Sequence, residues 1–132
     1  QLADSGIRES LHQMSLGWFL DEWHAGRLER ARVIRDQSPP DTPERAAMSF
    51  LLDGYPIDRL QKQIPAGAAP LMQFVIGERH AAAGDLKSAR VAFELSAEAA
   101  RRTGNRWWQA TAQARLDQLR VSGRSPSSST GS

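Results

Sequence analysis

The chain has 132 residues, of which 17 are basic and 15 acidic, and it contains no cysteine. A surplus of two positive charges is smaller than the clustered surplus with which nucleic-acid-binding proteins of this size attract phosphate, so nucleic acid is not the favoured partner. The absence of cysteine excludes disulfides, thiolate catalysis and cysteine-ligated zinc. No apolar run approaches the roughly 20 residues needed to cross a bilayer.

The basic residues are almost all arginine, since Lys62 and Lys87 are the only lysines. Together with abundant alanine, this composition is typical of a GC-rich bacterial genome. The functional interpretation is that arginine serves bidentate pairing with carboxylates at an interface. The chain opens on Gln1 rather than methionine, which fits an exported protein whose signal peptide has been removed and equally a cytoplasmic fragment, so the sequence predicts no compartment.

Four helices are expected in the first half of the chain. Residues 5–24 carry apolar residues at helical spacing, and further apolar residues widen the stripe, so we expect this helix to be buried between neighbours. The stripe contains Ile7, Leu11, Met14 and Trp18, widened by Leu16, Phe19, Leu20 and Trp23. Further helices are predicted over residues 27–36, 43–53 and 56–63. Asp41 or Thr42 is expected to cap the third, with Pro43 in its first turn.

Three more helices are expected in the second half, after a loop at residues 65–70. They cover residues 71–83, 86–102 and 106–121, and Gly84 and Gly104 end the first two. Residues 122–132 are rich in serine and glycine and predict a flexible tail. Because no segment alternates like a strand, the sequence predicts an all-α fold of about seven helices in antiparallel hairpins.

An internal repeat supports this organisation. Residues 25–33 read AGRLERARV and residues 83–91 read AGDLKSARV, with six of nine positions identical. Gly26, Gly54 and Gly84 each lie between two predicted helices, as expected for the tight turns of helical hairpins. A single hairpin cannot bury its apolar face, so neighbouring hairpins are expected to stack.

The segment from residue 70 to residue 104 resembles a tetratricopeptide repeat. The positions that carry the resemblance are Ile76-Gly77 in the first helix, Gly84-Asp85 in the turn, and Ala89 and Phe93 in the second helix. Departures from the pattern are Gln73 and His80 in place of aromatic residues and Arg101 in place of the closing proline. The resemblance implies one domain over residues 1–121, built as a short α-α solenoid that binds another protein.

Two groups of residues are candidate partner-binding sites in the second half. Trp107 and Trp108 either seal the end of the stack or provide an aromatic anchor, since tryptophan is enriched at binding hot spots. The resemblance places Phe74, Glu78 and Ala81 on the concave groove of the family. The basic and asparagine residues with which some members clamp a peptide carboxylate do not occur at the matching positions.

Arginines crowd the segment from Arg27 to Arg35, which also contains Arg30 and Arg32. One expectation is that this basic face is solvated and that its arginines pair with nearby carboxylates. The other is that it forms a rim around a protein partner, which Arg27 and Arg30 contact. His12, His24 and His80 are scattered and have no metal-site spacing, so no metal, cofactor or catalytic residue is predicted.

These observations lead to one functional hypothesis and one alternative. The hypothesis is a non-catalytic protein–protein interaction module, an accessory or scaffolding subunit of a larger complex. The alternative is a helical regulatory or nucleic-acid-binding domain that uses the Arg27–Arg35 basic face.

Overall fold

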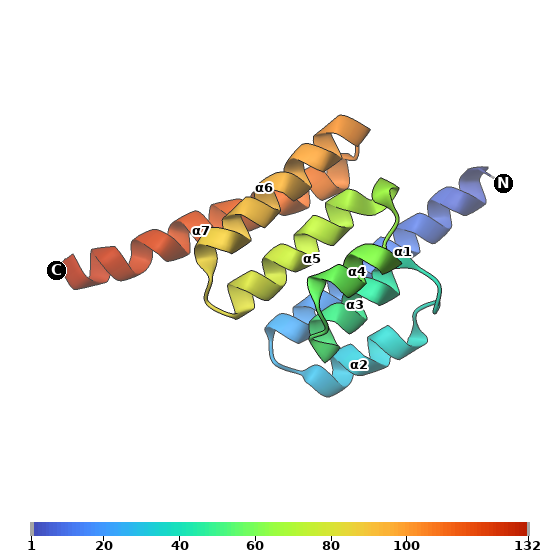
Figure 1. The fold of residues 1–132 in the computed structure, drawn as a ribbon, viewed down its shortest axis with the longest axis horizontal. Coiled ribbons are helices and arrows are strands. Elements are labelled where there is room, and N and C mark those ends of the chain that lie inside the picture. Colours follow the sequence, from blue (N-terminus) through green and yellow to red (C-terminus); the bar gives the residue numbers. More distant parts are fainter. Residues whose placement is uncertain (1, 132) are drawn as a thin grey trace. The chain divides into compact units, whose positions relative to one another are not determined.

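The structure, a computed structural model, describes the backbone of residues 2–131 and the side chains of residues 11–121. Over this part of the chain it contains seven α-helices, one 3-10 helix and no strand (Figure 1). The helices are α1 (Leu2–His24), α2 (Leu28–Gln37), α3 (Pro43–Asp53), α4 (Ile57–Gln63), η1 (Ala66–Ala68), α5 (Ala69–Ala82), α6 (Leu86–Thr103) and α7 (Arg106–Gly131). The predicted all-α fold class is therefore confirmed.

The helices gather into two compact units, divided between Gln63 and Ile64. In the first unit α1 and α2 form a hairpin, α3 packs on both, and α4 packs on α3. In the second unit α5 and α6 form a hairpin, and α7 packs on both. One domain over residues 1–121 stays a prediction, because contacts inside each unit do not test it.

The two copies of the sequence repeat have the same local structure. Gly26 and Gly84 end the first helix of their hairpins with φ of +78° and +84°, a left-handed conformation that glycine adopts without steric cost. In each copy the N–H after the glycine donates to the carbonyl five residues earlier. These bonds join Arg27 to Glu22 and Asp85 to His80, each at 2.9 Å. The repeat therefore encodes one type of helix–turn–helix connection.

The second helix of each hairpin starts in the same way. Arg27 and Asp85 occupy the N-cap positions with closely similar backbone angles, and the Asp85 carboxylate accepts from the Ser88 N–H at 3.1 Å. Four residues later, Ala31 and Ala89 are completely buried. A small side chain here lets the second helix approach its neighbours closely, as the sequence predicts.

Close approach also defines the core of the second unit. A Cβ atom at Gly77 of α5 would lie 2.8 Å from Cε1 of Phe93 on α6, so glycine is required for the two helices to lie at this distance. Phe93 contacts Phe74 edge-on with ring centroids 5.2 Å apart, and Phe74 also contacts Trp108 of α7. At the other end of the hairpin, the buried Ser96 hydroxyl donates to the Pro70 carbonyl at 2.7 Å.

Both ends of α3 follow the sequence prediction. The Thr42 hydroxyl accepts from the Arg45 N–H at 3.3 Å, and Pro43 occupies the first turn. Gly54 ends the helix in the left-handed conformation. The next residue, Tyr55, is buried against Phe50, and its hydroxyl lies 2.8 Å from the Ala46 carbonyl.

Helix α7 continues past Val121, where the sequence predicts its end, to Gly131. The side chains of residues 122–132 lie outside the described part of the chain. The flexibility of this serine- and glycine-rich segment stays a prediction.

Candidate protein-docking surfaces

Phe74, Glu78 and Trp108 lie in the core of the second unit. Their side chains are 1%, 1% and 5% exposed. The structure thereby corrects the expectation that Phe74 and Glu78 line a groove open to a partner. The physical reason is that α7 packs on α5 and α6 and covers the face of α5 that carries both residues.

Glu78 is buried as one half of an ion pair between α5 and α7. Its carboxylate receives two hydrogen bonds from the guanidinium of Arg115, from Nε at 2.9 Å and from Nη2 at 2.8 Å. The same guanidinium lies 5.4 Å from the centroid of the Phe93 ring. The pair thus holds α7 on the hairpin and is structural. Sequence reasoning missed Arg115, because nothing local links residues 37 positions apart.

Trp107 and Trp108 separate into a surface and a core residue, as the rotation of about 100° between neighbouring helical positions requires. Trp108 is buried against Phe74, whereas Trp107 is 40% exposed. The two indole rings pack edge to face, with their ring centroids 4.7 Å apart. Trp107 is therefore available to a partner, and Trp108 has the sealing position.

Every arginine of the Arg27–Arg35 basic face lies beside a carboxylate of the first unit. Arg27 and Arg30 both approach Glu22, which is 7% exposed. The other pairs join Arg32 to Glu29 at 2.6 Å, and Arg35 to Asp36 at 2.7 Å and to Asp53 at 3.3 Å. The positive charge of this face is thus largely balanced within the fold, which weakens its attraction for a polyanion.

Helix α1 presents an exposed apolar row, formed by Leu11, Met14 and Trp18. These side chains are 54%, 69% and 65% exposed. The opposite face of the helix carries Leu16, Phe19 and Leu20, which are buried. At 100° per residue the centres of the two faces lie about 160° apart. The expectation that α1 is buried on all its apolar sides is therefore wrong for one of them.

The sequence carries a signal for this row. At 100° per residue, the eight apolar residues of the helix divide into two sets on opposite faces and do not form one wide stripe. Large contiguous apolar patches on a protein surface mark sites of interaction, which makes this row a candidate.

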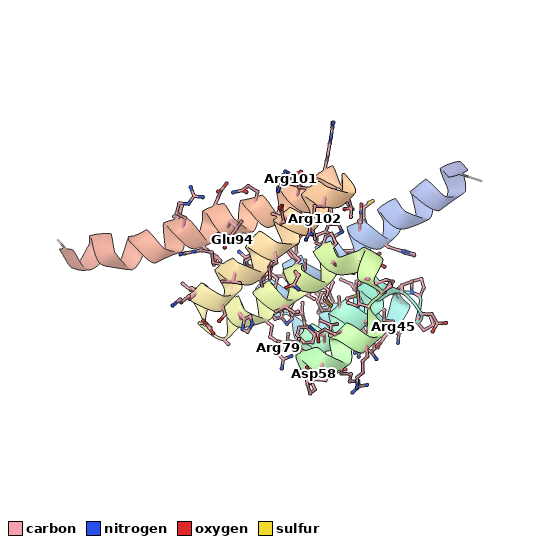
Figure 2. The ribbon with its side chains drawn as sticks, turned by 45° about the horizontal axis from the view of Figure 1, so that its top comes forward. Arg45, Asp58, Arg79, Glu94, Arg101 and Arg102 are labelled. Atoms are coloured by element: carbon pink, nitrogen blue, oxygen red, sulfur yellow. The ribbon has the colours of Figure 1, made fainter. Side chains whose placement is uncertain are left out.

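The described part of the chain also has two concave regions. A groove of about 490 Å³ runs between α6 and α7, and a polar hollow of about 400 Å³ lies beside α3 and α4. The groove is lined by Arg90, Glu94, Ala97, Gln113, Leu116 and Arg120. Figure 2 places Glu94 on α6, with Arg101 and Arg102 in the last turn of the same helix. Arg45, also labelled there, belongs to the hollow and donates to the Ser38 carbonyl at 2.9 Å.

Within the part of the chain described, no three metal-ligating side chains come together. Burial raises the pKa of Tyr55, and hydrogen bonds from Ser88 lower the pKa of the Asp85 carboxyl. Both groups have structural roles, Tyr55 beneath α3 and Asp85 at the cap of α6.

Comparisons of the chain with protein-family models, with curated proteins and with solved structures find no match. Within the described residues, no helix has the length and apolar character needed to cross a membrane.

Proposed function

We propose that this chain is a non-catalytic protein–protein interaction module, an accessory or scaffolding subunit that binds a protein partner through the apolar row of α1. The observation that carries the proposal is the exposure of Leu11, Met14 and Trp18 on one helix face, each more than half accessible. Tryptophan is enriched among the few residues that carry most of the binding energy of protein interfaces, and methionine is enriched at the cores of these interfaces. The proposal requires no cofactor and no catalytic residue.

The second unit is proposed to be a tetratricopeptide-like hairpin with a following helix. Supporting the resemblance are the contact of Gly77 with Phe93, the left-handed Gly84 in the turn, and the buried Ala89. These are the positions at which the sequence matches the family. Phe74 and Glu78 have no part in the proposed binding, since both are buried.

Trp107, Arg27 and Arg30 stay secondary candidates for partner contact. Trp107 offers an exposed aromatic surface, and the two arginines, whose side chains are 53% and 71% exposed, could bridge a partner's carboxylates while keeping contact with Glu22. The alternative function, nucleic-acid binding by the basic face, has no such observation in its favour. Each of its four guanidiniums already lies beside a carboxylate.

The proposal is tested by recovering native complexes with the wild-type chain and with a double substitution in the row, Met14→Ser with Trp18→Ser. A matched control carries Val91→Ser with Leu95→Ser on α6, where both residues are exposed apolar residues outside the row. We expect crosslinking and mass spectrometry to find the same protein bound to the wild type and the control, and lost from the row variant. Equal recovery by all three chains would contradict the proposal.

A further inference from the structure

Helix α2 buries little apolar surface for its length. Of its ten residues, all of them described, Ala31 is the one that is buried, and Leu28 and Val33 are 43% and 53% exposed. The matching helix of the second hairpin, α6, buries six of its residues. A helix of ten residues is marginal by itself in water, so its stability must come from contacts with its neighbours. Burial of one alanine methyl group supplies little of that stability.

The internal repeat shows which apolar anchor α2 lacks. Arg35 of α2 matches Phe93 of α6, since each lies four residues after the buried alanine of its copy. Phe93 is completely buried and packs on Phe74 of α5. The Arg35 side chain is 16% exposed, and its guanidinium donates to Ser49 and to Asp53 of α3, each at 3.3 Å. An ion pair therefore takes the place of the aromatic anchor of the second hairpin.

The other side-chain hydrogen bonds and ion pairs between α2 and the described residues of α1 and α3 also involve arginine. Arg30 lies 3.7 Å from the Glu22 carboxylate of α1, and Arg45 of α3 donates to the Asp36 carbonyl in the last turn of α2 at 3.4 Å. Dissolved salt screens charges that are exposed to water. Because the side chains of Arg30 and Asp53 are 71% and 55% exposed, salt is expected to weaken the attachment of α2.

Loops join α2 to its neighbours at both ends. Residues 25–27 connect it to α1, and residues 38–42 connect it to α3. Helix α2 can therefore lose its contacts without breaking the backbone hydrogen bonds of a longer helix. Elements with few buried apolar contacts are the ones that open locally, at a lower free energy than the whole fold.

We propose that α2 is a strap, held on α1 and α3 by arginine contacts, that opens by itself while the rest of the first unit stays folded. Rising ionic strength shifts the strap toward the open state. Opening makes accessible the faces of α1 and α3 on which α2 packs. The first unit thereby has a surface that is present only when the strap is open. This device is separate from the apolar row of α1 and goes beyond the proposed function.

Amide hydrogen exchange of the full chain, followed by mass spectrometry, tests the strap without any substitution. We expect the amides of α2 to be protected at least about tenfold less than those of α6. Between about 0.02 M and about 0.5 M sodium chloride, the protection of α2 is expected to fall about three- to tenfold, because its ion pairs are exposed. The protection of α3 and α6 is expected to stay unchanged over this range.

Three results of this measurement would overturn the strap. The first is protection of α2 equal to that of α3. The second is a joint loss of protection by α2 and α3, which would mean that the first unit opens as a whole. The third is protection of α2 that does not respond to salt.

Arg35→Gln tests whether the ion pair with Asp53 holds the strap, because it removes the charge and keeps a polar side chain of similar reach. We expect protection of α2 to fall about three- to tenfold at low salt, and the response to added salt to shrink. Arg101→Gln is the matched control, since Arg101 pairs with Glu98 of its own helix α6, and it is expected to leave α2 unchanged. Protection of α2 in Arg35→Gln equal to that of the wild type would remove the ion pair from the device.

Discussion

At Gly77 the backbone of α5 lies closer to the Phe93 ring than any side chain would permit. We predict that Gly77→Ala lowers the free energy of unfolding by about 1–3 kcal/mol, because the added methyl group must displace a packed ring. Gly17→Ala on α1 is the matched control, since the position is helical and nothing lies within 4 Å of the added atom.

For the control we predict a gain of about 0.5–1 kcal/mol from the higher helix propensity of alanine. Urea denaturation followed by circular dichroism measures both changes. Equal effects of the two substitutions would contradict the close packing of α5 on α6.

The two members of the Glu78–Arg115 ion pair differ in their access to water, because Glu78 is 1% exposed and the Arg115 side chain 21%. Removing the arginine takes two hydrogen bonds and the neighbouring positive charge away from a buried carboxylate, whereas removing the glutamate leaves a cation that can turn toward solvent. We predict that Arg115→Met costs about 3 kcal/mol of stability and Glu78→Leu less.

The double substitution Glu78→Leu with Arg115→Met is expected to recover most of that loss, because no charge then remains buried. Urea unfolding of the wild type, the two single variants and the double variant gives the coupling free energy between Glu78 and Arg115. Additive losses in the double variant would show that the two side chains do not act as a pair.

At the scale of the element, the cap of α6 makes stability depend on pH. Side-chain and backbone hydrogen bonds from Ser88 lower the pKa of the Asp85 carboxyl in the folded chain. Because the folded pKa is the lower one, this contribution is present above the unfolded pKa of about 3.9 and is lost as pH falls through the folded value. Asp85→Asn keeps a capping oxygen but removes the titration.

We therefore predict that the difference in melting temperature between wild type and Asp85→Asn shrinks as the pH falls below about 4. Thermal unfolding at a series of pH values measures it. A difference that stays constant down to the lowest pH would mean that the Asp85 charge does not support the cap.

Helix ends were predictable from the sequence because the signals that set them are local. Gly26 and Gly84 end helices through their own left-handed backbone, and Thr42 caps α3 by a hydrogen bond to Arg45. Each of these interactions lies within four or five residues of the position that sets it. The resemblance singled out Gly77 and Phe93 as separate positions, and their contact became visible only in the packed helices.

Candidate surfaces were harder to predict, because periodicity reveals the faces of a helix and not what covers them. It identified Leu11, Met14 and Trp18 as apolar and helically spaced, yet could not tell that this face of α1 is exposed. The expectation that Glu78 lines a groove came from the resemblance, which does not include Arg115, the residue 37 positions along the chain that pairs with it.

At the scale of the whole molecule, protein binding by the apolar row predicts that the row is covered when the chain is in its native complex. Leu11 and Val91 allow a matched comparison, because they are 54% and 52% exposed and lie in different units. A cysteine at either position is the only thiol in the chain.

The most direct measurement is the rate at which a water-soluble thiol reagent modifies Leu11→Cys and Val91→Cys, each in the dilute purified chain and in the native complex. Leu11→Cys removes one apolar side chain at the end of the row and keeps Met14 and Trp18. We expect the complex to slow modification of Leu11→Cys by about tenfold or more, which corresponds to a covering free energy of about 1.4 kcal/mol, and to leave Val91→Cys unchanged. Equal rates for Leu11→Cys in the free chain and in the complex would contradict docking through α1.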